Sequence, residues 1–204
     1  MLDNQASGRG EMGAAVAMAP SSATTLAFNL FYPLNEFYDR AGVPLPSVVR
    51  VEGSEVPEPY RSLLVHDRDM TPTLTEYYQR TMQLRILKRV LTETVFAREI
   101  VLEVEGQGKT AVYAAIKIYL DLFPPEAKRQ VLEGKLPFGT VLQTQGMIHS
   151  SWPQAFLRVA ADETINRALG ITGHSVLYGR RSALLNTAQM PLAQVLEIVP
   201  PAGR

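Results

Sequence analysis

Residues Val95–Phe123, VFAREIVLEVEGQGKTAVYAAIKIYLDLF, decide the fold. Apolar and polar residues alternate with a period of two along Val95–Glu105 and again along Thr110–Phe123. This is typical of β-strands with one apolar face and one more polar face. The four residues between them, Gly106-Gln107-Gly108-Lys109, are rich in the glycine that tight turns require. This stretch therefore predicts an antiparallel β-hairpin.

Turn and cap residues divide the chain after the hairpin into short elements. Pro124-Pro125 suits the start of a helix, Gly134 and Gly170 suit helix ends, and Asp162 suits an N-cap. Helices are predicted over residues 125–134, 138–143 and 162–170, and strands over residues 155–159, 175–185 and 193–199. The last two strands flank a turn at residues 186–191.

The chain before the hairpin is predicted to be mainly helical. One helix falls within Leu26–Tyr38, with Pro33 in its first turn and Gly42 at its end. After a proline-rich connection over residues 43–59, Thr71 is expected to cap a second helix, which starts at Pro72 and runs to about Arg80.

Two further segments complete the organisation of the chain. Residues 82–94 show a blurred two-residue period and stay open between strand and helix. Residues 1–24 are small, polar and without period, and we expect a flexible tail there, followed by one domain over residues 25–204. Helices followed by several antiparallel strands predict an α+β fold with a single antiparallel sheet.

Composition sets limits on the class of protein. The chain of 204 residues can bury one good core, and 46% apolar and 20% charged residues are the balance of a globular protein. Its net charge is zero and it has no basic run, so we expect no nucleic-acid partner. It has no cysteine and no apolar stretch long enough for a bilayer, so we expect a cytoplasmic protein without disulfides or a membrane span.

Two charged residues fall among apolar neighbours on their strands. Arg98 shares one strand face with Phe96, Ile100, Leu102 and Val104, whereas Glu99, Glu103 and Glu105 are assigned to the solvent face. Glu197 shares a face with Ala193, Val195 and Val199. A buried charge needs a partner. Either Arg98 and Glu197 form a structural ion pair, or both face a pocket in which the arginine holds a ligand carboxylate. Alternation alone does not decide between these interpretations.

Four segments, in the right order, resemble the chorismate–pyruvate lyase family. They are Asp69-Met70-Thr71, Phe96-Ala97-Arg98-Glu99-Ile100, Leu136-Pro137-Phe138-Gly139 and the closing stretch LYGRRSALLNTAQMPLAQVLEIVPP at residues 177–201. The family likeness covers about residues 60–201 and includes both charges that the alternation singles out. It implies an antiparallel sheet with helices packed around an enclosed pocket, and elimination of pyruvate from chorismate or a related cyclic carboxylate without a metal or other cofactor.

The resemblance also implies roles for individual residues. Arg98 would anchor a carboxylate of the ligand, and Glu197 would bind a hydroxyl group on its ring or relay a proton. Met70 and Phe138 would line the pocket around the ring. The likeness departs from the family at Lys117, which alternation turns away from the pocket, so a second carboxylate lacks its expected partner.

Two arginines are candidates for the cation that a second ligand carboxylate would need, Arg180 and Arg181. Adjacent strand residues point to opposite faces, so at most one of them faces the pocket, and a structural role for both stays open; Arg180 is named as the candidate substrate-binding residue.

Other functions and sites compete with this interpretation. The same fold resembles the effector-binding domains of GntR-type repressors, although residues 1–24 are too short for a helix-turn-helix, and an enzyme recruited to another metabolite is a third option. The segment His66–Asp69 fits a capped loop better than an acid–base cluster, and a Ser–His nucleophile at His149 is disfavoured. Three scattered histidines predict no transition-metal site. The sequence predicts no oligomeric state.

Overall fold

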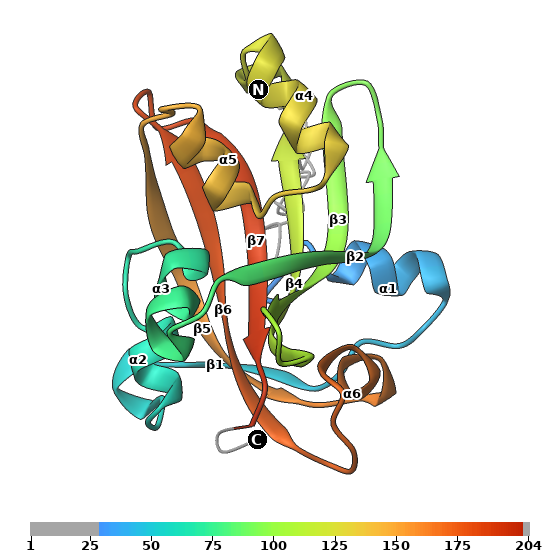
Figure 1. Ribbon diagram of the computed structural model, residues 1–204. Coiled ribbons are helices and arrows are strands. Elements are labelled where there is room, and N and C mark those ends of the chain that lie inside the picture. Colours follow the sequence, from blue (N-terminus) through green and yellow to red (C-terminus); the bar gives the residue numbers. More distant parts are fainter. Residues whose placement is uncertain (1–28, 202–204) are drawn as a thin grey trace, which may run out of the picture.

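The computed structural model describes residues 29–201, so the predicted tail over residues 1–24 lies outside the described residues. Seven antiparallel strands form a single sheet in the order β1-β5-β6-β7-β4-β3-β2 (Figure 1). The strands are β1 (Val48–Val51), β2 (Met82–Leu91), β3 (Val95–Val104), β4 (Lys109–Tyr119), β5 (His149–Ala160), β6 (Val176–Asn186) and β7 (Pro191–Val199). The helices are α1 (Asn35–Ala41), α2 (Tyr60–Leu64), α3 (Met70–Tyr78), α4 (Pro125–Glu133), α5 (Phe138–Thr144) and α6 (Glu163–Leu169), with 3-10 turns η1 (Gly53–Glu55) and η2 (Leu120–Leu122). The predicted α+β fold with one antiparallel sheet is confirmed.

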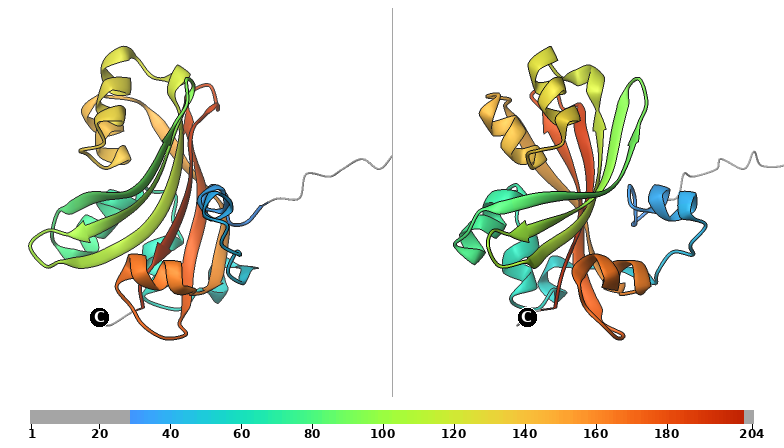
Figure 2. Two further views of the ribbon diagram at one scale, coloured as in Figure 1. Left: turned by 90° about the vertical axis from the view of Figure 1, so that its right-hand side faces the viewer. Right: turned by 45° about the vertical axis from the view of Figure 1, so that its right-hand side comes forward.

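Helices cover both faces of the twisted sheet. Figure 2 shows α1 and α6 on one side of the sheet, and α2, α3, α4 and α5 on the other. Along β3 the even-numbered residues pack toward the second group: Phe96 joins a core with α4 and α5, and Ile100 joins one with α2 and α3. Odd-numbered residues such as Val101 pack in a core with α1 and α6. Each strand face therefore meets a hydrophobic layer.

Most caps lie where the sequence places them. Gly134 and Gly170 end α4 and α6 in the left-handed conformation, and Asp162 accepts a hydrogen bond from the Ile165 amide at the start of α6. Two helix starts differ from the prediction. α1 begins at Asn35, two residues after Pro33, and the N-cap of α3 is Asp69, so that Thr71 already lies inside the helix.

The ambiguous segment 82–94 contains a strand, β2. Its pairing with β3 shifts register between Ile86 and Lys88, a bulge that inserts Leu87. An extra residue in a strand reverses the alternation from that point on, which is why the two-residue period is blurred. The connection over residues 43–59 also contains a strand that the sequence does not reveal, β1, which pairs with β5 at the edge of the sheet.

The assignment of Glu99 to solvent is wrong. Its side chain is buried, with 2% of its surface exposed. The Tyr113 hydroxyl donates to Glu99 Oε1 at 2.9 Å, and Lys88 Nζ lies 3.0 Å from Oε2. The face that Glu99 shares with Tyr113 is covered in the folded protein, since α1 and α6 pack over it.

None of the helices in the described residues is long and apolar enough to cross a membrane.

Candidate functional site

A cavity lies between the sheet and the N-terminal ends of α3 and α5. The empty space between its walls, counted together with its opening to solvent, is about 600 Å³. Its walls are mainly apolar and include Met70, Ile100, Ile116, Phe138, Leu184 and Val195. The polar side chains among its lining residues are Asp69, Thr71, Arg98, Ser151, Arg180, Ser182 and Glu197.

Strand register gathers the charged lining residues on one face of the sheet. Arg98 pairs with Ile116, Ile116 with Val195, and Val195 with Ser182, so these four residues form one row across β3, β4, β7 and β6. The next row contains Ala114 opposite Glu197, and Glu197 opposite Arg180. Arg98 and Glu197 are thus two strands apart, a separation of about 10 Å across the sheet.

Arg98 is a buried charge without a carboxylate partner among residues 29–201. Only 1% of the residue is exposed, and neither Nε nor Nη1 donates to any of the residues described. Burial lowers the pKa of its guanidinium to about 10, which leaves it cationic at neutral pH. A buried cation without a counterion costs on the order of several kcal/mol. Its position in the cavity wall therefore favours an anionic ligand.

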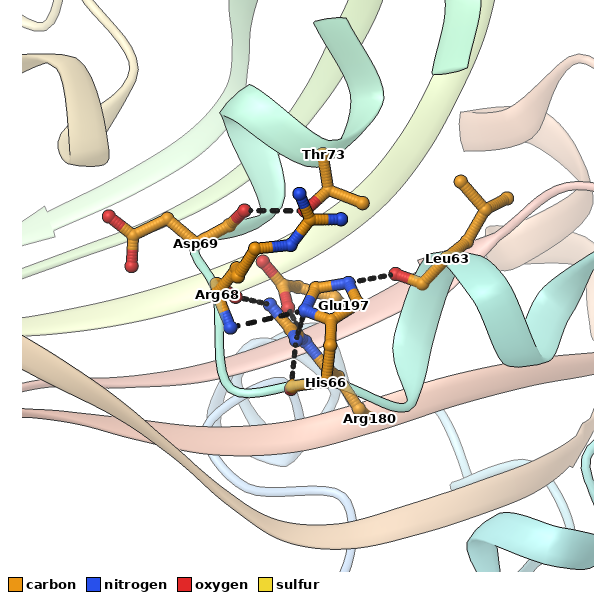
Figure 3. A network of polar contacts seen from close by, with 7 residues as sticks. All are labelled: Leu63, His66, Arg68, Asp69, Thr73, Arg180 and Glu197. Carbon is orange, nitrogen blue, oxygen red and sulfur yellow. Dashed lines mark hydrogen bonds and ion pairs between the residues drawn. The ribbon is translucent and has the colours of Figure 1, made fainter. Parts of the chain in front are cut away.

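Glu197 forms an ion pair with Arg180. Arg180 Nε donates to Glu197 Oε2 at 2.7 Å, and both residues are buried. Figure 3 shows that Arg180 also reaches the loop before α3: its Nη1 donates to His66 O and its Nη2 to Arg68 O, both at 3.1 Å. Within the described residues no ion pair joins Glu197 to Arg98, so the first of the two interpretations, a structural Arg98–Glu197 ion pair, is wrong. Arg180 holds the loop on the sheet and is not a free second cation.

His66 completes this network as a neutral ring. Its Nε2 lies 2.8 Å from Leu63 O, which can only accept, whereas its Nδ1 lies 3.1 Å from Arg180 Nη1, which can only donate. The tautomer with hydrogen on Nε2 satisfies both contacts. Burial, followed by the positive charge of Arg180, lowers the pKa of His66.

The remaining predicted residues lie as follows. Met70 and Phe138 are buried in the cavity wall, the first at the start of α3 and the second at the start of α5. Arg181 points to the opposite face, where its Nη1 donates to Asn29 O at 2.6 Å. Lys117 also lies away from the cavity and pairs with Glu36 at 2.6 Å.

Sequence reasoning missed two features of the cavity. Ser182 is buried, its Oγ has no hydrogen-bond partner in the described part of the chain, and it lines the cavity two residues after Arg180. The two-residue period of β6 could have identified it. The second feature is a pair, His149 Nε2 and Asp69 Oδ2, which lie 2.8 Å apart. No local signal predicts this contact, because 80 residues separate the partners.

Possible metal ligands do not cluster: residues 29–201 contain no group of three or more histidine, cysteine, aspartate or glutamate side chains that could hold a metal ion.

No protein-family model and no curated protein matches the sequence. Solved structures do match. The effector domain of PhnF from Mycobacterium smegmatis is 10% identical with a TM-score of 0.51, covering 66% of this chain and 90% of that one. The structure of PhnF itself is 11% identical with a TM-score of 0.51, covering 84% and 94%. A GntR-family transcriptional regulator from Bacillus cereus is 9% identical with a TM-score of 0.46, covering 60% and 94%.

These matches correct the expectation of an enzyme. The resemblance of the sequence implied a lyase, but the matching structures that reach a TM-score of 0.51 are the effector domain of PhnF and PhnF itself. The prediction of a lyase is therefore withdrawn. The chain has the chorismate lyase-like fold, which it shares with the effector domain of PhnF.

Proposed function

We propose that residues 25–204 form a domain that binds a small cyclic or aromatic carboxylate without transforming it. The observation that carries this proposal is Arg98, a buried cation in the cavity wall with Nε and Nη1 unpaired among the described residues. A carboxylate can accept two parallel hydrogen bonds from a guanidinium and neutralise its charge.

The other walls suit a ring with a polar group at its far end. Met70 and Phe138 provide apolar contacts for the faces of a ring. Glu197 lies two strands away from Arg98, and Arg180 occupies only its Oε2. A hydroxyl group of the ligand could donate to the other carboxylate oxygen. The Ser182 hydroxyl lies in the same row as Arg98 but three strands away, where it can hydrogen-bond a substituent of the ring.

The charge balance favours a ligand with one carboxylate. Arg180 is neutralised by Glu197, and Lys117 pairs with Glu36 on the opposite face of the sheet. Only Arg98 among the cationic lining residues has no carboxylate partner in the described part of the chain. A second carboxylate in the ligand would be desolvated beside Glu197 without compensation.

Thermal-shift assays and calorimetry with a matched set of ligands test this proposal. Benzoate, 4-hydroxybenzoate and cyclohexanecarboxylate should stabilise the protein, whereas 4-hydroxybenzamide and phthalate should bind at least about tenfold more weakly, because they lack the charge or carry a second one. The bound carboxylate should be recovered unchanged after prolonged incubation. Equal binding of the amide and the carboxylate, or no binding of any monocarboxylate, would contradict the proposal.

A further inference from the structure

The His149–Asp69 pair lies where the cavity meets a groove on the surface. Asp69 lines the cavity and also a groove between α3 and α5, whereas His149 lines the groove alone. Thr71 and Gly139 are likewise shared by the cavity and the groove. The contact between His149 and Asp69 therefore lies in the wall between the groove and the cavity.

The pair also brings together three elements at this wall: α3, β5 and α5. Asp69 is the N-cap residue of α3, yet its side chain does not cap the helix. Its carboxylate turns instead to His149, the first residue of β5. The same carboxylate packs against the start of α5, where a Cβ atom at Gly139 would lie 3.3 Å from Asp69 Oδ2. One contact thus joins α3 to β5 beside the first turn of α5.

The geometry of His149 requires two hydrogens on the ring. Its Nδ1 lies 2.9 Å from Met147 O and its Nε2 lies 2.8 Å from Asp69 Oδ2. A carbonyl oxygen and a carboxylate can only accept, and a neutral imidazole has a single N–H to donate. Both hydrogen bonds exist together only when His149 is an imidazolium. His66 shows the opposite arrangement, with one acceptor and one donor facing its ring nitrogens.

The charges around His149 favour the same state. Asp69 on the N-terminal side of α3 is the carboxylate in contact, and it raises the pKa of His149 against the opposing effect of burial. Glu76, also on α3, lines the groove and is paired with Arg68 at 2.8 Å. The groove residues of α5 are the neutral Thr140 and Gln143, and the strand neighbour of His149 on β6 is the neutral Asn186. Asp67, in the loop before α3, lines a second groove together with Ser150, the residue after His149.

We propose that the groove between α3 and α5 leads into the cavity and that the His149–Asp69 pair is a protonation-controlled latch on this entrance. While His149 is cationic, the latch holds the start of α3 against β5 and slows the exchange of ligand. When His149 loses its proton, one of its two hydrogen bonds is lost and the entrance opens more often. The role in ligand exchange rests on the proposed function, but the latch itself is a property of the protein without ligand.

The first test uses the ligand-free protein. NMR titration of the histidine rings should give His149 a pKa above the ordinary value of about 6.5, and Asp69→Asn should lower it. Amide hydrogen-exchange protection at the starts of α3 and α5 should fall about tenfold as pH rises through the pKa of His149, the effect of losing one charge-assisted hydrogen bond in a partly exposed pair. His149→Gln should show the low protection at every pH, and His174→Gln, which changes an exposed loop histidine, should behave as wild type.

The second test measures dissociation of 4-hydroxybenzoate by stopped flow. Dissociation should accelerate with pH in wild type and be fast and independent of pH in His149→Gln. The latch is refuted if His149 titrates at or below its ordinary pKa, or if the protection and dissociation rates of wild type and His149→Gln agree at all pH values. Absence of benzoate binding would refute the proposed function alone, because the titration and the exchange data still decide the latch.

Discussion

Two arginines with equal burial have different roles in this protein. Arg98 and Arg180 are each 1% exposed. Arg180 donates to Glu197 and to two backbone carbonyl oxygens, so its charge is compensated by the fold itself. Arg98 lines the cavity with two of its nitrogens unpaired among the described residues. A buried charge that the fold does not satisfy marks a ligand site, whereas a satisfied one marks a structural junction.

This difference predicts opposite effects of the same substitution. Arg98→Met should raise the free energy of unfolding of the ligand-free protein by about 1–4 kcal/mol, because an apolar side chain replaces an uncompensated charge. Arg180→Met should lower it by about 3–5 kcal/mol, because Glu197 then stays buried without its partner. Urea denaturation of both variants measures the two changes. If both substitutions destabilise the protein equally, Arg98 has a partner that the structure does not show.

Part of the site follows from the sequence at this scale. A two-residue period suffices to turn Arg98 and Glu197 inward and Lys117 away from the cavity, because β3, β4 and β7 keep regular register there. The partner of Glu197 does not follow. Arg180 and Arg181 are adjacent, and only the paired strands show which of them shares a face with Glu197.

At the scale of elements, a glycine sets the distance between β6 and β7. A Cβ atom at Gly179 would lie 2.5 Å from the backbone oxygen of Glu197. Because that oxygen belongs to a paired strand, it cannot move aside as the end of a side chain could. Gly179 therefore allows the close approach that places Arg180 beside Glu197.

We predict that Gly179→Ala destabilises the protein by about 1–3 kcal/mol, the usual cost of forced overpacking, and weakens carboxylate binding. Gly139→Ala is the matched comparison, since its added methyl group would meet the side chain of Asp69 at 3.3 Å. Thermal denaturation of both variants should show a clearly larger loss for Gly179→Ala. Equal stability of the two variants would show that β6 and β7 can separate at little cost.

Sequence patterns predict elements best where local chemistry decides them. The hairpin of β3 and β4 and the caps of α4 and α6 depend on nearby glycine, proline and aspartate, and the sequence predicts all of them. The face of Glu99 is mispredicted because its burial depends on α1 and α6, which come from distant parts of the chain. The strand β2 is ambiguous in the sequence because its bulge interrupts the two-residue period. The inserted residue can be identified only from the pairing of β2 with β3.

At the scale of the whole molecule, the protonation of two histidines makes the stability of the folded protein depend on pH in opposite directions. The pKa of His149 is raised in the folded protein, so its contribution is complete below the unfolded value of about 6.5 and is lost as pH rises through the folded value. The pKa of His66 is lowered, so its contribution is present above that unfolded value and is lost as pH falls through the folded value.

Denaturation as a function of pH measures this difference. The stability advantage of wild type over His149→Gln should shrink as pH rises above about 6.5, and its advantage over His66→Gln should shrink as pH falls below about 6.5. Advantages that do not change with pH would mean that neither ring has a perturbed pKa in the folded protein.

The distant contacts around the cavity are the part that the sequence could not predict. His66 meets Arg180 across 114 positions and Asp69 meets His149 across 80. Such contacts arise from the docking of the loop before α3 on the strongly twisted sheet, which no local period encodes.

The central claim is that Arg98 holds the carboxylate of a small ligand. A double-mutant cycle tests it most directly: the dissociation constants of 4-hydroxybenzoate and 4-hydroxybenzamide are measured by calorimetry for wild type and for Arg98→Met. Wild type should prefer the carboxylate by about 10–100-fold, the value of a charge-assisted hydrogen bond, and Arg98→Met should lose this preference. A preference that survives the substitution unchanged would contradict the account.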